Sequence, residues 1–277
     1  MQNAGIAALG LDWRYLAFDV HPEHLRAAIS GAKAMKFVGL NLTLPHKLFA
    51  VAMVDVIDSS AKEWGAVNTI RFEARTQSGD WLPVSEFEGE SSDIIRSVGF
   101  NTDADGLGLA LSEDIGLHLA GAKVVLLGAG GAARSAALKF AAEGVAELFI
   151  VNRTASKAGE LVREIQQRFP AVKTGTDYPT GPVDLLLNAT SLGLNPDDPL
   201  PLDEKRLPLK NARAVYDMTY RPAESALLRA AKAAGCRAAN GLGMLLHQGA
   251  MALEIWSGRP APTEAMRQAL KKDIYGV

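Results

Sequence analysis

The stretch from Lys123 to Thr154 constrains the fold of this chain more than any other part of it. The apolar run Val124–Leu127 has the composition of a buried parallel strand, and a glycine-rich turn follows it at once. An alanine-rich segment with a helical pattern then continues to about Glu143, and the apolar run Leu148–Val151 follows. A strand, a turn, a helix and a second strand within roughly thirty residues predict one βαβ unit, and therefore an α/β fold.

The turn inside this unit has the spacing of a dinucleotide-binding loop. Gly128 permits a tight turn, Gly130 lets the backbone approach a pyrophosphate, and Ala133 lets helix and strand pack closely. The free N–H groups at the helix start would then face the phosphates. Because the motif stands between a strand and a helix, it predicts a bound dinucleotide.

The end of the second strand indicates which dinucleotide binds. NAD sites place Asp or Glu there to accept a hydrogen bond from the ribose 2′-hydroxyl, whereas this chain has Asn152, Arg153 and Thr154, with Lys157 one turn on. An arginine can pair bidentately with a 2′-phosphate, and cations at a helix N-terminus oppose the macrodipole, which favours an anionic ligand. The sequence favours NADP; the alternative is that Arg153 and Lys157 are ordinary solvated charges.

Composition limits the classes of protein that remain. The length of 277 residues suggests two domains, and the net charge of −2 argues against nucleic acid or a membrane surface as a partner held by charge. No apolar run approaches a membrane span in length, and the start MQNAGIAALGLDW lacks a signal-peptide pattern. Cys236 is the single cysteine, so no intrachain disulfide and no cysteine-based zinc site is expected. We predict a cytoplasmic protein without a metal site.

Strand and helix patterns alternate along both halves of the chain. The expected strands are 13–20, 37–43, 67–72, 124–127, 148–151, 183–187, 215–218 and 236–239. Pro45 is expected to end the strand before it, with a helix following through Val56, a short connection over Asp58–Gly65, and another helix from Pro222. The acid- and glycine-rich stretch Arg75–Ser97 is expected to be an exposed hairpin or loop. This alternation predicts an open, mostly parallel sheet in the first half.

Polar residues gather at the ends of these predicted strands, where open α/β sheets bind ligands. They include Asn41, Thr69, Asn101, Thr102 and Asn188. Eight segments that carry such residues resemble the shikimate dehydrogenase family, in the family's order and over nearly the whole chain. The segments are GLNLTLPHK (39–47), GAVNTI (65–70), NTDADG (101–106), GAGGAAR (128–134), NRTASKA (152–158), NATSLG (188–193), YDMTYRP (216–222) and NGLGMLLHQGA (240–250).

This resemblance implies an NADP-dependent hydride transfer between 3-dehydroshikimate and shikimate, in the pathway to chorismate and the aromatic amino acids. It also implies two α/β domains with a cleft between them. Residues 1–104 with 246–277 would form the substrate-binding and catalytic domain, and residues 105–245 a Rossmann domain that binds NADP. The expected partner is the small-molecule substrate, and the expected state is a monomer or a homodimer.

The resemblance assigns roles to individual residues. Lys47 matches the catalytic lysine and Asp103 its partner, which suits ketone reduction because an ammonium can stabilise the developing alkoxide and supply the proton. The substrate-binding positions would be Thr43, Asn68, Tyr220 and Gln248. The cofactor-binding positions would be Gly128, Ala129, Gly130, Gly131, Ala132, Asn152, Arg153, Thr154, Lys157, Thr190, Met218, Gly241 and Met244, with Met244 near the nicotinamide.

Two departures from the family's pattern stand out. NTDADG replaces the family's usual NTDG, which we expect to change only the turn. The family has a strand and a shikimate-binding Ser-x-Ser-Pro segment ahead of the point where MQNAGIAALG begins, so we expect weak shikimate binding and self-association through an open sheet edge. Two alternatives remain open: a quinate/shikimate dehydrogenase of broader specificity, and a non-catalytic NADP-binding module.

Overall fold

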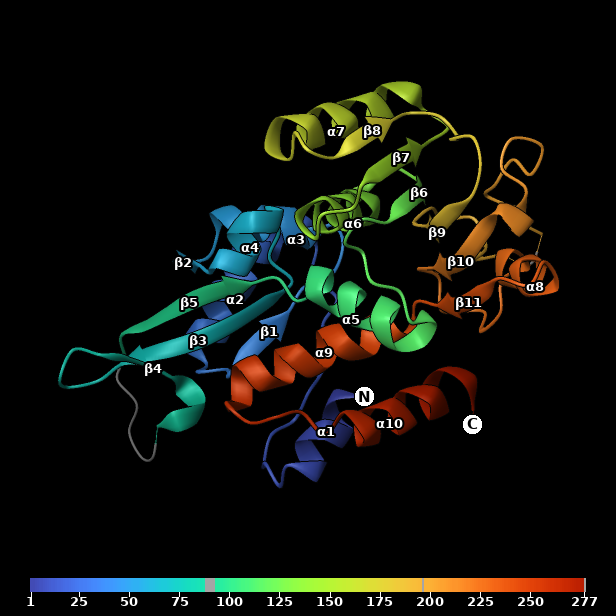
Figure 1. Cartoon of the computed structure of the whole chain (residues 1–277). Helices are drawn as coiled ribbons and strands as arrows, with labels where there is room; N and C mark the ends of the chain where they lie inside the picture. The colour runs from blue at the N-terminus through green and yellow to red at the C-terminus, as the bar shows by residue number, and fades with distance from the viewer. Residues whose placement is uncertain (88–92, 196, 277) are drawn as a thin grey trace. The chain divides into compact units, whose positions relative to one another are not determined.

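The chain folds into two units. The computed structural model describes residues 1–87, 93–195 and 197–276 (Figure 1). The first unit consists of Met1–Asp103 with Gln248–Val277, and the second unit is the continuous stretch Ala104–His247. The chain therefore leaves the first unit once and returns to it once.

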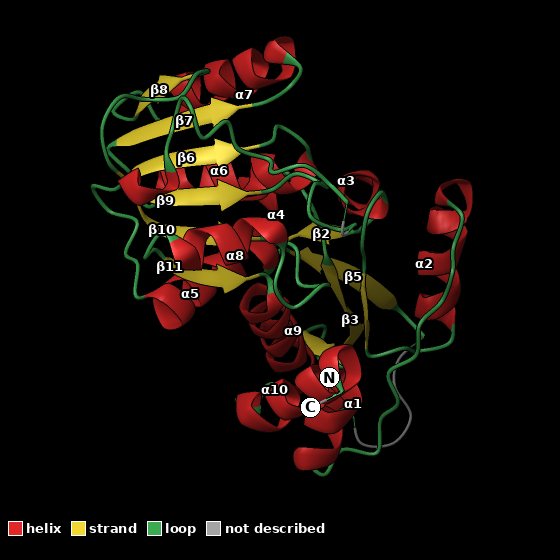
Figure 2. Ribbon diagram, turned by 90° about the vertical axis from the view of Figure 1, so that its right-hand side faces the viewer, coloured by secondary structure: helices red, strands yellow, loops and turns green. Residues whose placement is uncertain are grey.

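The second unit is built on a parallel sheet. Within its described residues, six strands pair in the order β11-β10-β9-β6-β7-β8, every pairing parallel, and Figure 2 shows the central strands as arrows that point the same way. The strands are β6 (Lys123–Leu127), β7 (Glu147–Val151), β8 (Lys173–Gly175), β9 (Val183–Asn188), β10 (Ala212–Asp217) and β11 (Arg237–Asn240). The helices are α5 (Asp103–Ile115), α6 (Gly131–Ala142), α7 (Ala155–Arg168), α8 (Ala226–Ala233) and the start of α9 (Leu242–Ser257).

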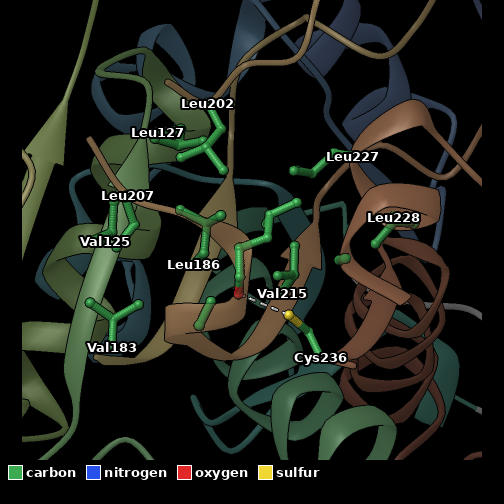
Figure 3. Packing of buried hydrophobic residues seen from close by; sticks show 13 residues of the cluster. Val125, Leu127, Val183, Leu186, Leu202, Leu207, Val215, Leu227, Leu228 and Cys236 are labelled. Carbon is green, nitrogen blue, oxygen red and sulfur yellow. Dashed lines mark hydrogen bonds between the residues drawn. The ribbon is translucent and has the colours of Figure 1, made fainter. Parts of the chain in front are cut away.

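Apolar packing on this sheet explains why its strands are continuous apolar runs. Val125, Leu186 and Val215 project from neighbouring strands into one buried cluster, and Leu227 and Leu228 cover them from α8 (Figure 3). Helices α6 and α7 pack against β6, β7 and β8. Parallel strands with helices packed on them lose their contact with water, so side chains in both directions must be apolar. The predicted strand–turn–helix–strand unit is confirmed in β6, α6 and β7, as is the α/β fold class.

The first unit is built on a mixed sheet. Its described strands pair in the order β1-β3-β5-β2, and β4 also pairs with β3. They are β1 (Gly39–Asn41), β2 (Val56–Ile57), β3 (Thr69–Arg75), β4 (Trp81–Pro83) and β5 (Ile95–Phe100). The helices are α1 (Gln2–Ala8), α2 (Leu25–Ala34), α3 (His46–Phe49), α4 (Ser59–Trp64), α10 (Thr263–Tyr275) and the remainder of α9. Figure 1 shows α1 beside α10, which agrees with their direct packing.

The prediction of a mostly parallel sheet in the first half was wrong. β3 runs antiparallel to β1, β4 and β5, and only β2 and β5 pair in parallel. Parallel neighbours need a crossover connection, whereas the connection from β3 to β5 contains the strand β4. The stretch Arg75–Ser97, predicted to be an exposed hairpin or loop, contains this connection and the strand β4. Residues 88–92 within it lie outside the described residues.

Local side-chain bonds account for two further corrections. The predicted strand Trp13–Val20 does not form, and the side chain of Asn3 instead bonds both the N–H and the carbonyl of Tyr15, at 2.8 and 3.0 Å. The predicted connection Asp58–Gly65 contains α4, because Asp58 accepts from the Ser60 N–H at its start and Gly65, at φ 65°, ends it.

The helices predicted after Pro45 and from Pro222 both differ from the prediction, the first in its end and the second in its start. The stretch after Pro45 forms α3, then a short 3-10 turn over Ala50–Ala52, and Val56 already belongs to β2. Helix α8 begins at Ala226 rather than Pro222, because the Ser225 hydroxyl caps it by accepting from the Leu228 N–H. Over the described residues, no helix is both long and apolar enough to cross a membrane.

Candidate functional site

The Lys47 ammonium and the Asp103 carboxylate form an ion pair in the first unit. Lys47 lies in α3, directly after β1 and the turn that follows it, and Asp103 is the first residue of α5. The distance from Lys47 Nζ to Asp103 Oδ2 is 2.7 Å, and the two side chains are 23% and 12% exposed. The ammonium is therefore held by a largely buried carboxylate, and the lysine side chain retains some exposure.

Asn68 holds the other oxygen of Asp103. Its Nδ2 donates to Asp103 Oδ1 and to Thr102 Oγ1, each at 2.9 Å. Its Oδ1 accepts from the Thr102 N–H at 2.9 Å, and the Asn101 side chain accepts from the Asp103 N–H at 3.0 Å. Both carboxylate oxygens thus have a fixed donor, and Asp103 has little freedom to turn. Asn68 itself is 1% exposed, with its amide satisfied inside the protein.

The remaining predicted substrate residues differ in their surroundings. Gln248 lies on α9, and its backbone carbonyl accepts from Thr102 Oγ1 at 2.9 Å, which links it to the Asn68 and Asp103 group. Thr43 is exposed just after β1, and its carbonyl accepts from the His46 N–H at 2.9 Å. Tyr220 is 38% exposed and belongs to the second unit.

The glycine-rich turn of the second unit follows β6 as expected. Gly128 has φ 112°, and a Cβ there would lie 3.1 Å from the Ala189 carbonyl oxygen, so a side chain would be strained and crowded. Helix α6 then begins at Gly131 with Gly130 as its N-cap, and no side chain caps it. Its first N–H groups and its dipole are therefore available to an anion.

A second helix start carries the two cations that favour NADP. Arg153 and Lys157 are exposed beside the start of α7, whose N-cap Thr154 makes no side-chain cap, and Asn152 Nδ2 donates to the Thr154 carbonyl at 2.9 Å. Within the described residues, neither cation forms an ion pair. Positive charges at an uncapped helix N-terminus fit a phosphate group of a ligand.

A buried polar group shapes the ends of β9 and β10. Asn188 and Asp217 are 0% exposed, and Asn188 Nδ2 donates to Asp217 Oδ1 at 3.0 Å. Asn188 Oδ1 accepts from the N–H and the hydroxyl of Thr190, while Asp217 accepts from the Thr219 N–H and the Ser225 hydroxyl. These bonds set the loops that carry Thr190 and Met218. Sequence analysis missed Asp217, although it stands inside the segment YDMTYRP.

Gly241 and Tyr216 fix the backbone at the start of α9. A Cβ on Gly241 would lie 2.1 Å from the Met218 carbonyl oxygen, so glycine is needed for this close approach. The Tyr216 hydroxyl accepts from the Met244 N–H at 3.3 Å. Tyr216 is fully buried, and burial, with the negative charge of Asp114 nearby, raises the pKa of its hydroxyl far above the ordinary value. The Tyr216 hydroxyl is therefore neutral and supports the backbone at Met244 through this hydrogen bond. Sequence analysis missed this residue.

Asp105 in the departure NTDADG also has a defined place. It lies in the first turn of α5, and its Oδ1 accepts from Lys139 Nζ at 2.7 Å. The departure therefore adds an ion pair between α5 and α6 in the second unit. Among the described residues, no group of three or more His, Cys, Asp or Glu side chains is placed to hold a metal ion.

These features together define a class of protein. A parallel sheet with a glycine-rich turn, two uncapped helix starts and a Lys–Asp pair characterise an α/β dehydrogenase. Three family models match the chain: the shikimate dehydrogenase substrate binding domain at residues 1–70, shikimate/quinate 5-dehydrogenase at 110–191, and the shikimate 5′-dehydrogenase C-terminal domain at 241–271. The chain belongs to the shikimate dehydrogenase family, as the resemblance of its motifs predicted.

Curated relatives agree over nearly the whole chain. The NADP(+) shikimate dehydrogenase of Geobacter metallireducens is 39% identical, over 97% of this chain and 89% of the relative. That of Methanopyrus kandleri is 38% identical, over 99% of this chain and 90% of the relative.

Solved structures agree as well, and one carries a different name. The Thermus thermophilus shikimate 5-dehydrogenase in complex with NADP(H) and shikimate is 32% identical with a TM-score of 0.79, and covers 98% of this chain and 92% of its own. The ligand-free 5-ketofructose reductase of a Gluconobacter strain is 36% identical with a TM-score of 0.81, over 98% and 92%. Similarity of this degree thus includes a reductase named for another polyhydroxylated ketone.

Proposed function

We propose that this protein catalyses the NADP-dependent, reversible reduction of 3-dehydroshikimate to shikimate, a step in aromatic amino acid biosynthesis. The observation that carries this proposal is the bond of 2.7 Å between Lys47 Nζ and Asp103 Oδ2. The pair stands at matching positions of the family's motif, and the names of the curated relatives support the substrate and the cofactor.

The two charged side chains divide the acid–base work. Bound NADPH supplies the hydride. The Lys47 ammonium donates a hydrogen bond to the ketone oxygen, stabilises the negative charge that develops on it, and transfers a proton to it. Asp103 orients the ammonium, because its own position is held by Asn68 and by the Asn101 side chain. In the reverse direction, neutral Lys47 takes the proton from the shikimate hydroxyl.

The predicted cofactor residues fit a dinucleotide phosphate. Gly128 permits the turn, and Gly130 leaves room for the pyrophosphate at the start of α6, whose N–H groups would face it. Arg153 and Lys157 have no counter-ion within the described residues, so both can pair with the 2′-phosphate. We assign the second unit to NADP on these grounds, with the remaining predicted contacts from the loops after β7, β9 and β10 and from the start of α9.

We assign the substrate chiefly to the first unit. We expect Thr43 and Gln248 to bond the ring hydroxyls or the carboxylate, and Tyr220 is the predicted contribution from the second unit. Asn68 was predicted to bind substrate as well. Since its donors already serve Thr102 and Asp103, a bond from Asn68 to substrate would replace one of these.

A turnover assay tests the proposal. The purified full chain is given shikimate or quinate with NADP or NAD, and formation of reduced nicotinamide is followed by absorbance. We expect the highest kcat/KM with shikimate and NADP. Equal or better use of quinate would establish the enzyme of broader specificity. Normal NADP binding without turnover of either acid, or of the other ketone considered below, would establish the non-catalytic module.

A second candidate is the reduction of another polyhydroxylated ketone. The similarity to 5-ketofructose reductase favours it, because the same Lys–Asp chemistry serves any ketone that the site can hold. The assay is therefore repeated with 5-ketofructose and NADPH. A kcat/KM above that for 3-dehydroshikimate would replace the proposed substrate and leave the assignment of Lys47 and Asp103 intact.

A further inference from the structure

A line of hydrogen bonds runs through the first unit behind Asp103. The Tyr15 hydroxyl donates to Asn41 Oδ1 at 3.1 Å, and Asn41 Nδ2 donates to Thr69 Oγ1 at 3.0 Å. The Thr69 hydroxyl donates to Asn68 Oδ1 at 3.0 Å, and Asn68 Nδ2 donates to Asp103 Oδ1 at 2.9 Å. The line therefore ends on the carboxylate that holds Lys47.

The donor and the acceptor in each bond of this line are fixed by which atoms carry a proton. The backbone N–H of Thr102 can only donate, so the Asn68 atom that it meets is the amide oxygen. The Thr69 hydroxyl accepts from the nitrogen of Asn41, and its single proton goes to Asn68. All four bonds thus donate toward Asp103. Donors aligned in one direction polarise one another, which strengthens the bond to the carboxylate.

The middle of the line is shielded from water. Thr69 is 0% exposed and Asn68 is 1% exposed. Thr69 lies on β3, opposite Asn41 of β1 and Phe100 of β5, so two neighbouring strands hold its backbone. Burial also raises the pKa of Tyr15, so its hydroxyl remains a protonated donor at the start of the line. Water therefore cannot substitute for the Thr69 hydroxyl in the native protein.

We propose that Thr69 is a positioning residue for ketone reduction, and this inference rests on the function proposed above. The Thr69 hydroxyl fixes the amide of Asn68, the amide orients Asp103, and Asp103 aims the Lys47 ammonium. Thr69 never touches substrate or cofactor. Its loss should lower kcat, because the ammonium is then aimed less well at the reacting oxygen, and it should leave NADP binding unchanged.

The test replaces the hydroxyl without changing the shape of the side chain. Thr69→Val should lower kcat for shikimate oxidation about tenfold, the effect of one buried hydrogen bond, with an unchanged Kd for NADP. Thr69→Ser keeps the hydroxyl and should restore kcat. Thr174→Val is the matched control, because the Thr174 hydroxyl is buried on β8 of the second unit without a hydrogen-bond partner within the described residues.

The possible outcomes separate this inference from the proposed function. If the wild type turns over shikimate and Thr69→Val keeps wild-type kcat, the inference is wrong and the function stands. If Thr69→Ser loses as much kcat as Thr69→Val, the hydroxyl is not the cause and the inference is again wrong.

A second measurement decides the case in which the wild type does not turn over shikimate. Lysine is labelled with ¹⁵N at Nζ, and the Lys47 ammonium signal is assigned by its loss in Lys47→Ala. Thr69→Val should shift or broaden that signal while Thr69→Ser preserves it. An unchanged signal in Thr69→Val would overturn the inference whatever the substrate is.

Discussion

The two units use their sheets in opposite ways. In the second unit, the central strand β6 is apolar inside, with Val124, Val125 and Leu126 each 0% exposed, and the buried residues Asn188 and Asp217 are the last residues of β9 and β10. In the first unit, the mixed sheet buries polar side chains along its strands, including Thr69, Glu73 and Ser97. The candidate cofactor site therefore consists largely of main-chain N–H groups, whereas the Lys47 site depends on side chains held by other side chains.

This difference predicts how each site responds to substitution. Backbone at the end of a strand keeps its position as long as the sheet is intact. A single side chain at such a site therefore affects which cofactor binds more than whether a cofactor binds at all. A side chain held by a hydrogen-bond line loses its position when any member is removed. The variants below test this contrast, beginning with the largest expected effect.

Lys47→Ala should show the first unit's dependence on a single side chain. We expect kcat for shikimate oxidation to fall about 10²–10⁴-fold, the usual contribution of a general acid–base group. The Kd for NADP, measured by fluorescence titration, should stay the same. Lys62→Ala, which removes an exposed lysine from α4 of the same unit, is the control. Near-normal kcat in Lys47→Ala would remove the assignment of the catalytic pair.

Arg153→Ala should change specificity in the second unit and leave the site in place. Loss of a charge-assisted bond of about 1.5–3 kcal/mol predicts a KM for NADP that rises roughly ten- to hundredfold. The KM for NAD, which has no 2′-phosphate, should hardly change. Arg163→Ala removes an exposed arginine further along α7 and should affect neither cofactor. Equal losses with NADP and NAD would contradict a role at the 2′-phosphate.

Tyr216→Phe tests how strongly the candidate cofactor site of the second unit depends on one side chain. The variant removes the acceptor for the Met244 N–H, and a bond of about 0.5–1.5 kcal/mol predicts a KM for NADP roughly two- to tenfold higher. Tyr178→Phe also deletes a hydroxyl that accepts from a backbone N–H, that of Asp203, and should leave the KM unchanged. If both variants behave alike, main chain alone maintains the start of α9.

Asp55→Asn tests, through stability, an exposed carboxylate that accepts hydrogen bonds from the buried Ser97 of the first unit's sheet. Although burial opposes its ionisation, bonds from Lys33 and Ser97 hold the pKa of Asp55 below its ordinary value of 3.8. A depressed folded pKa adds stability that is complete above the ordinary value and is lost as the pH falls through the folded pKa. The Tm difference between wild type and Asp55→Asn should therefore be largest near neutral pH and shrink in acid.

The control for this measurement is Asp12→Asn, because the Asp12 side chain is fully exposed beside Arg14. Its Tm should match the wild type at every pH, since exposed pairs contribute little. A Tm difference for Asp55→Asn that persists unchanged into acid would show that shape, rather than charge, is what Asp55 contributes.

The parts of the fold that could be predicted are those with a local cause. The apolar run before Gly128 and the alanine-rich pattern after it are sufficient for β6 and α6, because burial and periodicity act over a few residues. The pairing of β3 could not be predicted in this way, since hydrophobic patterns do not specify the direction of a neighbouring strand. Tyr15 is not in a strand because the Asn3 side chain forms hydrogen bonds with its backbone N–H and carbonyl. No pattern within residues 13–20 indicates these bonds.

The same distinction applies to the candidate sites. Lys47 and Asp103 are 56 positions apart, and their bond of 2.7 Å was expected from family motifs rather than from spacing. The buried partners Asp217 and Tyr216 were missed because each satisfies a group distant in sequence, and short motifs say nothing about that. The roles of the substrate- and cofactor-binding residues remain predictions for the variants above.

The interruption of the first unit has a consequence for its synthesis. Its sheet leaves the ribosome early, but Trp256 of α9, whose indole N–H donates to the Ile70 carbonyl at 2.9 Å, follows 186 residues later. Likewise, the Gln2 side chain donates to the carbonyl of Gly249, which is synthesised 247 residues later. The continuous second unit is complete before either contact can form, and domains generally fold as they emerge. The unit that begins first is therefore finished last, and a nascent chain halted directly after His247 would carry a complete second unit beside an unfinished first one.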